Sequence, residues 1–521
     1  MHPVHLHILV LWDYNNNVET PLPPMPNGVA RVYPASGATA MLPLTPANNW
    51  TPTILFCGGS AMSADDYGNY SFPAINTWEF PASNDCQRIT PEPTDGSSPT
   101  YIQDDGMIQG RTMGQFIILP NGKMLVVNGG SNGTAGYATA TGQTPTIGMM
   151  PFAESLASGP IGQPVIYDPN APAGSRWSNT GLATSSIARL YHSSAMLLPD
   201  GSVMIAGSNP NIDVNTTAIY PTTYKAEYFY PPYFSANIRP RPSGIPQTLS
   251  YGGNPFDITI PASSYSGSGN TAAANATVVL TRGGFTTHGM NMGQRYLQLN
   301  NTYTVNSDGS IALHTAQVPP NPSLFTPGPA LFWVTINGIP SNATMVQVGN
   351  GQIGSQPTST ASPLPNSVQL SSASGSPDGS KTGSTKGVTS HTGALIGGIA
   401  GAVAVIGILG ALFGVCVARH RRRVTAKQSL SASYSMSSTV GVGDAGAMGG
   451  GMRRSDSSSF MPLQTNSSIA WNPSSPNLNA PYRDDFAVRP SVTSSLEEFN
   501  PYLEEDTPVG VPGPRYERPR Y

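Results

Sequence analysis

Tyr191, His192 and His288 are the residues of this chain whose types and spacing could hold a redox metal. Tyr191 and His192 are adjacent in IARLYHSSAMLLPDG, and His288 follows a Gly-Gly pair in GGFTTHGMNMGQR. Two imidazole nitrogens and one phenolate oxygen form a donor set that suits Cu(II) in a tetragonal N,O site. The residues alone leave a second interpretation open, in which both histidines are isolated surface or core residues.

The backbone around these residues must be irregular if they are to meet at one ion. Tyr191 and His192 open a predicted β-hairpin, and adjacent side chains on a regular strand point to opposite faces. A bulge or loop at this point would let both side chains reach the same ion. His288 falls in a loop of a second predicted domain, so the ion would be held by two domains.

The other six histidines fit this chemistry less well. His314 alternates with polar residues in a predicted strand, which indicates a structural role. The remaining five are His2, His5 and His7, whose HxxHxH spacing could bind a metal, and His391 and His420, which lie in other segments.

The front of the chain repeats one pattern of two apolar strands joined by a tight turn. ILPNGKMLVVNGGS begins at Ile118, LLPDGSVMIAGSN begins at Leu197, and a looser copy runs from Met41 to Ser60. Asn-Gly and Asp-Gly between apolar runs are strong hairpin signals. Further strands, VIYDPN and VLWDYNNN, lie between or before the copies. The repeat predicts four-stranded blades of a kelch-type β-propeller over residues 1–238, with only about three blades present.

A second all-β domain is predicted over residues 239–351. ATVVLTRGG, YLQLN, GSIALHTAQVP and ALFWVTINGIPS are short strands at the spacing typical of an immunoglobulin-like E-set sandwich. Composition agrees with an all-β fold, since the chain has 56 Gly, 51 Pro and only 10% charged residues. The net charge of −3 argues against a nucleic-acid partner.

The remaining third predicts a membrane anchor. Residues 352–393 are rich in Ser, Thr, Gly and Pro and predict a stalk, and residues 394–418 form an uncharged run long enough to span a bilayer as a helix. Four arginines and a histidine follow in RHRRR, so residues 419–521 are expected to form a disordered cytoplasmic tail. The glycine spacing in the span also permits a weak helix dimer.

The predicted location is the plasma membrane, single-pass, with both β domains outside. Sequons for N-glycosylation support this topology; they lie at Asn49, Asn69, Asn132, Asn215, Asn275, Asn300 and Asn342. The start of the chain, MHPVHLHILVLWDYNNN, does not resemble a signal peptide. We therefore expect a natural N-terminus that lies further upstream.

Residues 8–350 resemble the C-terminal part of glyoxal oxidase, in the copper radical oxidase family that includes galactose oxidase. The stretches that carry the resemblance are WDYNNNVETPLPPMPNG, ILFCGGS, NDCQRIT, RLYHSSAMLLPDG, GGFTTHGMNMGQR and PPNPSLFTPGPALFWVTING. The resemblance implies a propeller followed by an immunoglobulin-like domain. It also implies the oxidation of small aldehydes such as glyoxal and methylglyoxal, or of primary alcohols, by O2 with release of H2O2.

The resemblance assigns roles to the three candidate residues. Tyr191 matches the axial tyrosinate that accepts the substrate proton, and His192 and His288 match the two imidazole ligands of one copper ion. Cys57 and Cys86 match a cysteine pair of the family and are expected to form a disulfide.

One part of the family's chemistry has no counterpart in this chain. The family uses a second tyrosine cross-linked to a cysteine, and the segment that carries this pair lies before the region matched by Trp12. The equivalent local stretch, GRTMGQFIILPNG, has Met113 and no tyrosine. A thioether between Cys57 and Tyr67 or Tyr70 is a weaker alternative to the disulfide.

Three functions remain open on the sequence. The first is a membrane-anchored copper radical oxidase that is inactive as the chain stands, because the radical segment is absent. The second is a noncatalytic cell-surface or cell-wall binding protein or sensor. The third is a poorly folded remnant that retains only the copper ligands.

Overall fold

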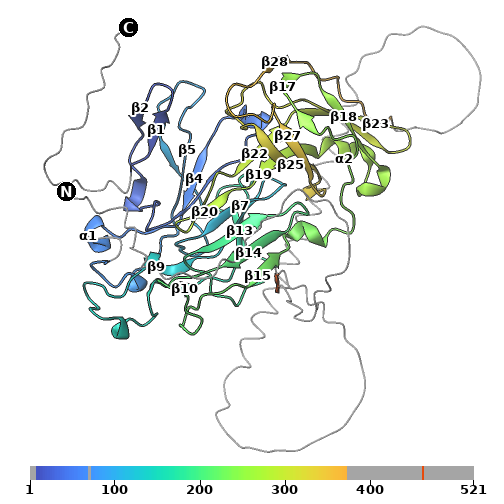
Figure 1. The fold of residues 1–521 in the computed structure, drawn as a ribbon. Coiled ribbons are helices and arrows are strands. Elements are labelled where there is room, and N and C mark those ends of the chain that lie inside the picture. Colours follow the sequence, from blue (N-terminus) through green and yellow to red (C-terminus); the bar gives the residue numbers. More distant parts are fainter. Residues whose placement is uncertain (1–7, 69–71, 372–459, 463–521) are drawn as a thin grey trace, which may run out of the picture. The chain divides into compact units, whose positions relative to one another are not determined.

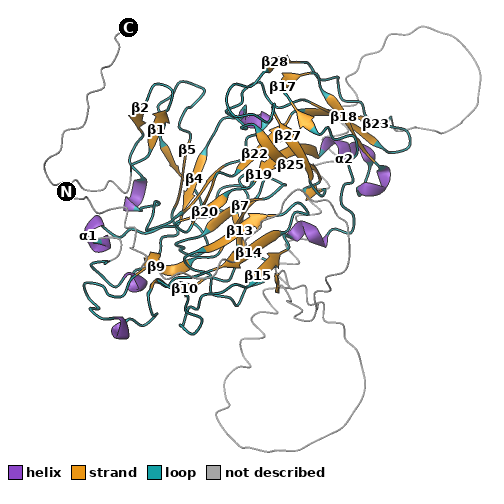
Figure 2. Ribbon diagram, viewed as in Figure 1, coloured by secondary structure: helices purple, strands orange, loops and turns teal. Residues whose placement is uncertain are grey.

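A computed structural model describes residues 8–68 and 72–371, together with the backbone of residues 460–462 (Figure 1). Strands dominate the described part of the chain, and its helices are short (Figure 2). The helices are α1 (Ala64–Tyr67), α2 (Gly269–Ala274) and single 3₁₀ turns at Pro26–Gly28, Pro46–Asn48, Thr77–Glu79, Ile147–Met149, Pro232–Ser235 and Ala262–Ser264. The fold class is therefore all-β, as the turn-rich composition predicts.

Three four-stranded antiparallel sheets repeat one pattern, in which the order of the strands across the sheet is their order along the chain. The first sheet contains β3 (Ala38–Met41), β4 (Ile54–Cys57), β5 (Cys86–Ile89) and β6 (Tyr101–Gln103). The second contains β7 (Gln115–Ile118), β8 (Met124–Val127), β11 (Val165–Tyr167) and β12 (Trp177–Ser178), with the hairpin β9 (Gly130–Tyr137) and β10 (Ser155–Pro160) inserted. The third contains β13 (Ser193–Leu197), β14 (Val203–Gly207), β15 (Ala226–Phe229) and β29 (Phe460–Pro462). This order is consistent with propeller blades.

The tight turns between the first two strands of the second and third sheets are those that the sequence predicts. Gly122 and Gly201 have φ of 80° and 89°, a left-handed conformation that costs glycine little. Each turn closes with a backbone hydrogen bond of 2.8 Å, from Leu119 to Lys123 and from Leu198 to Ser202. The Asn-Gly and Asp-Gly signals therefore mark hairpins.

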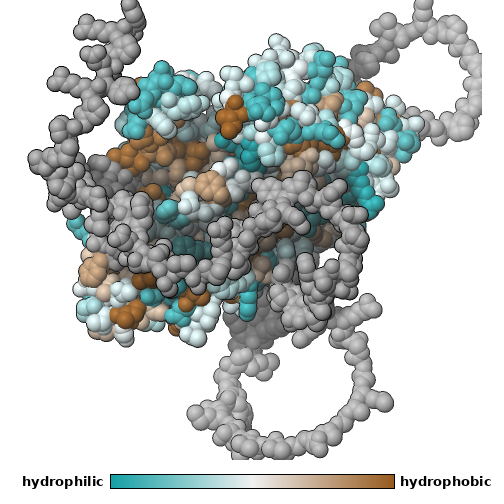
Figure 3. Space-filling model, in the orientation of Figure 1, coloured by the Kyte–Doolittle hydropathy of each residue, from teal (hydrophilic) through white to brown (hydrophobic). Residues whose placement is uncertain are grey.

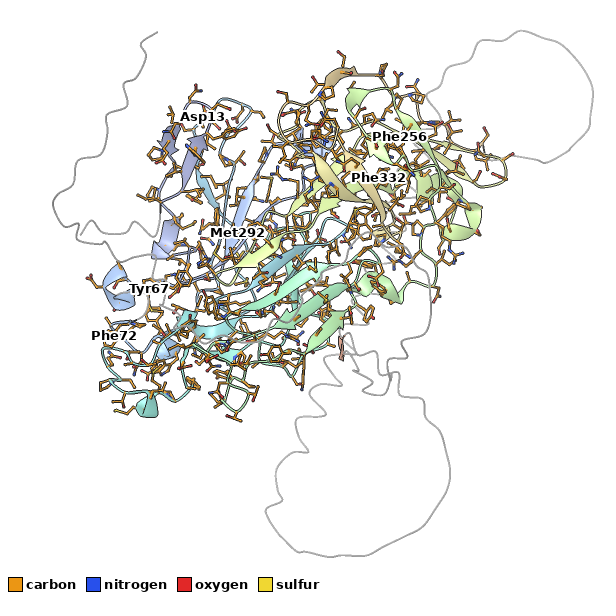
Figure 4. All side chains as sticks on the ribbon, viewed as in Figure 1. Asp13, Tyr67, Phe72, Phe256, Met292 and Phe332 are labelled. Atoms are coloured by element: carbon orange, nitrogen blue, oxygen red, sulfur yellow. A yellow bond between two sulfur atoms is a disulfide. The ribbon has the colours of Figure 1, made fainter. Side chains whose placement is uncertain are left out.

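Residues from about 248 onward form a sandwich of two sheets. One has the strand order β16 (Thr248–Leu249), β27 (Thr344–Val348), β25 (Gly328–Ile336), β19 (Ala276–Arg282) and β22 (Arg295–Leu299), with β26 (Ile339–Pro340) beside β25. The other contains β18 (Phe256–Ile260), β24 (Ile311–Thr315) and β23 (Asn301–Val305). The predicted strand over 330–336 is the centre of the larger sheet. Phe256 and Phe332 meet between the two sheets with ring centroids 6.2 Å apart (Figure 4).

One hydrophobic core joins the sandwich to the propeller-like sheets. Trp333, Val279 and Tyr296 of the sandwich cluster with buried residues of all three sheets, including Phe116 and Phe229. Trp333 is fully buried, and its indole nitrogen donates to Thr281 at 2.8 Å. The two domains predicted from sequence therefore share apolar packing.

A further hairpin, β1 (Val10–Asp13) with β2 (Val18–Pro21), is exposed along its whole length. Its residues Val10 and Leu11 border a groove of about 720 Å³ that also reaches Trp50 and Leu324. Figure 3 shows hydrophobic side chains gathered in this area, near β1, β4 and β5.

The first part of the predicted stalk packs on the sandwich. The strand β28 (Thr358–Ala361) pairs in parallel with β17 (Tyr251–Gly253). Val368 forms backbone hydrogen bonds with Tyr303 at 2.7 Å and Val305 at 2.9 Å, and Asn270 bonds the backbone of Leu370 in both directions. Composition did not reveal this packing, because the contacts use backbone and amide groups rather than apolar side chains.

The predicted tail also departs from expectation at three residues. The backbone of β29 pairs antiparallel with β15, so residues 460–462 form a strand where a disordered segment was expected. The predicted span, 394–418, lies outside the described residues. Among the residues that are described, no helix is long and apolar enough to cross a membrane.

Candidate metal centre

Tyr191 and His192 lie in an irregular turn immediately before β13. His192 has a φ of 62°, so the backbone leaves the extended conformation at this residue. The two rings consequently stack, with centroids 4.0 Å apart and planes inclined by 28°. The irregular backbone that the copper interpretation requires is present, and it brings both side chains to one place.

Hydrogen bonds orient the His192 ring. Its Nδ1 lies 2.8 Å from the backbone carbonyl of Asn209, which can only accept, so Nδ1 carries the proton. The backbone N–H of Asn209 in turn donates to the carbonyl of Tyr191 at 2.8 Å. This arrangement leaves Nε2 with its lone pair available to a metal, which is the usual role of a second hydrogen bond to a ligating imidazole.

His288 lies at the tip of a two-residue hairpin between β20 (Phe285–Thr287) and β21 (Met290–Met292). His288 and Gly289 have φ of 54° and 75°, the signs that a type I′ turn requires. The Nδ1 atom of His288 lies 2.7 Å from Thr287 Oγ1, and its carbonyl accepts from Ser36 Oγ at 2.6 Å. The sequence predicted a sandwich loop here, and the structure makes it a hairpin.

The hairpin is fastened to the second sheet. Gln294 donates to the carbonyl of Phe116 at 2.5 Å and accepts from the backbone N–H of Ile118 at 3.0 Å. Asn291 donates to the same carbonyl at 3.2 Å. Met292 marks the hairpin in Figure 4. These bonds fix the position from which the sandwich presents His288.

Tyr33 joins Tyr191 to His288, and sequence reasoning missed it. Its ring centroid lies 6.2 Å from that of Tyr191 and 5.1 Å from that of His288. The Tyr33 phenol is close enough to raise the pKa of Tyr191. The ring centroid of Tyr137 lies 6.3 Å from that of Tyr191 and 6.2 Å from that of His192. The three predicted residues therefore lie within one cluster of aromatic rings.

A repeated motif could have revealed Tyr33. A three-residue motif occurs three times, with an arginine two positions before a residue of this cluster. The copies are Arg31-Val32-Tyr33, Arg111-Thr112-Met113 and Arg189-Leu190-Tyr191. Met113 is fully buried and packs with Tyr191 in the same small core, to which Tyr33 is also adjacent. The spacing is an internal repeat that relates Tyr33, Met113 and Tyr191 to one another.

The Tyr191 phenol is protonated at neutral pH in the metal-free protein. Burial raises its pKa above the ordinary value, and the neighbouring phenols of Tyr33 and Tyr137 raise the pKa further. A cation beside the oxygen would favour the phenolate, so metal binding would release a proton.

The donor set fits Cu(II). Among the described residues, no three His, Cys, Asp or Glu side chains gather around one point, so a metal centre here depends on the tyrosine oxygen. The two histidines are exposed and Tyr191 is 8% exposed, which leaves the imidazole nitrogens accessible. Two imidazoles and a phenolate are ligands that copper accepts.

The other predicted site residues lie elsewhere. Cys57 and Cys86 are joined in a disulfide, so neither sulfur is available for a thioether to Tyr67. His314 bonds Asp257 at 2.7 Å and Thr304 at 2.9 Å on the face of the sandwich, away from the cluster. His2, His5, His7, His391, His420 and Tyr70 lie outside the described residues.

The sequon asparagines differ in exposure. Four are exposed, at Asn49, Asn275, Asn300 and Asn342, and two are half-buried, at Asn132 and Asn215. The Asn132 amide donates to Ser158 at 3.2 Å, which makes this side chain less accessible than the exposed four. Asn69 lies outside the described residues.

Comparisons with known proteins agree with the two-domain organisation. Residues 7–233 match the family model "Glyoxal oxidase N-terminus", and residues 239–348 match "Galactose oxidase-like, Early set domain". The chain is 32% identical over 354 residues to Aldehyde oxidase GLOX1 of Arabidopsis thaliana, a match that covers 65% of this chain and 51% of that protein.

Other relatives show the same partial coverage. Aldehyde oxidase GLOX of Vitis pseudoreticulata is 32% identical over 65% of this chain and 58% of its own length, and a galactose oxidase of Gibberella zeae is 28% identical over 49% and 32%. The structure of a fungal alcohol oxidase in complex with copper aligns with a TM-score of 0.44 at 18% identity, over 63% of this chain and 56% of that one. The chain thus spans about half the length of the aldehyde oxidases that it matches. Its two matched domains, in this order, show that the chain belongs to the glyoxal oxidase family with a galactose oxidase-like early set domain.

Proposed function

We propose that this protein binds one copper ion through Tyr191, His192 and His288, and that its site serves the oxidation of small aldehydes or primary alcohols by O2. In the aldehyde reaction, RCHO, H2O and O2 give RCOOH and H2O2. Names of its relatives as aldehyde oxidases and a galactose oxidase support the reaction class. Glyoxal and methylglyoxal are the substrates that we propose first.

The observation that carries this proposal is the meeting of Tyr191, His192 and His288. The stacked pair comes from the turn before β13 and His288 from the sandwich hairpin, and Tyr33 contacts both groups. His192 and His288 are 96 positions apart in the sequence, and each imidazole is oriented by a hydrogen bond at Nδ1.

Each residue has a distinct role in the proposed site. Copper, when bound, would supply a Lewis-acidic and redox-active centre. His192 and His288 would hold it through Nε2, and Tyr191 would bind it as the phenolate. The Tyr191 oxygen would also accept the proton removed from the substrate, because it is the basic oxygen of the cluster. Tyr33 would hold this oxygen in place through its hydroxyl.

The decisive experiment measures copper and peroxide separately on the full chain. We expect one Cu(II) per chain, with an electron paramagnetic resonance spectrum that shows coupling to two imidazole nitrogens. His192→Ala should lose one of the two nitrogen couplings. His314→Ala is the matched control, because His314 is bonded elsewhere in the sandwich and its loss should leave the spectrum unchanged. Absence of stoichiometric copper from the wild-type protein would refute the proposal.

A noncatalytic surface protein is the second candidate, because the described residues offer no sulfur for the family's tyrosine–cysteine cross-link. Cys57 and Cys86 are bonded to each other, so neither is available for a cross-linked tyrosine. Copper binding without peroxide from glyoxal, methylglyoxal or a primary alcohol would support this candidate. Retention on cell-wall material that does not depend on copper would support it further.

We also propose a single-pass plasma-membrane location with both β domains outside. The uncharged run 394–418 and the basic residues after it support this topology. Protease treatment of intact cells should remove the β domains and spare a C-terminal tag. Glycosidase treatment should shift the wild-type mass, and removal of the exposed Asn342 sequon should reduce the shift.

A further inference from the structure

Three arginines hold equivalent places in the three sheets. Each guanidinium donates to backbone carbonyls beyond the end of the ladder between the second and third strands of its sheet. The acceptors are Gly58 and Asp85 for Arg31, Asn128 and Gln163 for Arg111, and Gly207 and Lys225 for Arg189. Each arginine thus joins the turn before the first strand of its sheet to the end of the ladder between the second and third strands.

In the first and third sheets a carboxylate completes this arrangement. Asp85 lies 2.5 Å from Arg31, and Glu227 accepts from Arg189 at 2.8 and 3.0 Å. In the second sheet the residue equivalent to Asp85 is Gln163, which is neutral. The Gln163 side chain bonds Leu182 and Thr184, and only the backbone carbonyl of Gln163 accepts from Arg111. Arg111 forms no ion pair with any carboxylate in the described part of the chain.

Arg111 is nevertheless the most deeply buried of the three side chains. It is 1% exposed, and burial lowers its pKa to about 9 with no carboxylate to oppose the effect. An isolated buried charge costs several kcal/mol unless it is compensated. Its Nε and the nearby Asn128 Nδ2 are buried donors without a hydrogen-bond partner. The Nε of Arg31 shares this property, so the missing carboxylate is what distinguishes the second sheet.

We propose that a small inorganic anion, chloride, binds beside Arg111 and takes the role that Asp85 and Glu227 have in the other two sheets. A halide accepts N–H donors and carries the one negative charge that Arg111 lacks. The burial of Arg111, which is 1% exposed, argues for a small ion. The proposal is independent of the copper site and of any catalytic activity.

The test compares thermal unfolding of the full chain in sodium chloride and in sodium gluconate at equal sodium concentration. Gluconate is too large to reach a side chain as buried as Arg111. We expect the wild-type Tm to rise with chloride and to saturate, by about 2–4 °C when chloride reaches about five times its Kd. Equal Tm values in the two salts would overturn the proposal.

Two variants make the test specific. Gln163→Asp gives the second sheet the residue of the first, so it should abolish the chloride dependence and retain a Tm in gluconate at least as high as the wild type in chloride. Gln369→Asp makes the same change of charge at an exposed position and should keep the full dependence. Full dependence in Gln163→Asp would also overturn the proposal, as would a bromide-soaked crystal whose anomalous peaks lie only away from Arg111.

Discussion

The second and third sheets share one scaffold, and only the third presents proposed metal ligands. The turn before the first strand spans Arg111 to Gly114 in the second sheet and Arg189 to His192 in the third. Each turn contains a single left-handed residue that is not glycine, Met113 with φ 55° and His192 with φ 62°. Met113 is fully buried, and His192 is exposed. The position of the left-handed residue in the turn, rather than the sheet that follows it, therefore decides whether the turn exposes a side chain that could bind a metal.

The largest effect on stability is expected when the carboxylate that anchors the turn of the third sheet loses its charge. Glu227→Gln leaves the buried Arg189 without its carboxylate, and we expect unfolding free energy to fall by about 3–5 kcal/mol. Urea midpoints measure the change. Lys123→Met removes one partner of the exposed pair with Asp168 and should cost no more than about 1 kcal/mol. Similar losses in both variants would contradict the role of burial.

Removal of a ligand makes the third turn chemically equivalent to the second. His192→Ala should weaken copper binding by about 100-fold or more, which corresponds to about 2.7 kcal/mol. Competition with a copper chelator of known affinity measures the effect. Met113→Leu preserves volume at the equivalent turn and should change affinity little. A large loss in Met113→Leu would indicate that the thioether is also a ligand.

The reverse exchange tests whether the second turn could have held a ligand. Gly114→His places a Cβ within 2.6 Å of Arg111 Cδ, so the buried arginine must move. We expect a loss of about 1–3 kcal/mol in stability and no second copper ion. Thermal unfolding and copper stoichiometry measure these outcomes. A stable variant that binds two copper ions would show that the scaffold accepts ligands in either sheet.

The smallest effect concerns the proton on Tyr191. Tyr33 raises the pKa of Tyr191, so Tyr33→Phe should lower that pKa and let the phenol ionise at a lower pH than in the wild type. Absorbance near 295 nm in the metal-free protein follows this titration. Copper binding, which needs the phenolate, should then weaken less as the pH falls. Tyr137→Phe is the control, because the Tyr137 phenol contributes less to the raised pKa.

Much of the fold could be predicted, because local signals and tertiary structure agree. Asn121-Gly122 predicts a hairpin since glycine tolerates the left-handed turn, and the strands beside it alternate as a sheet requires. The packing of Val368 against Tyr303 could not be predicted, because backbone hydrogen bonds leave no mark on composition.

The candidate site was predictable in its residue types and less so in its neighbours. Tyr191, His192 and His288 carry recognisable metal-binding chemistry. Tyr33 precedes a proline in RVYPASG, which reads as a turn, and only the repeated arginine two residues earlier relates it to Tyr191. The missing counter-charge at Arg111 likewise appears only when the three sheets are compared in space.

The core shared by Trp333, Val279 and Phe116 bears on how such proteins can be recombined. The boundary near residue 238 separates two recognisable sequence families, yet a cut there would expose the apolar surfaces that face each other across it. The described residues of both parts accordingly belong to one compact unit by their contacts. An exchange of the sandwich between two relatives would succeed only if the facing side chains were exchanged with it, so the two parts are expected to diverge as a matched pair.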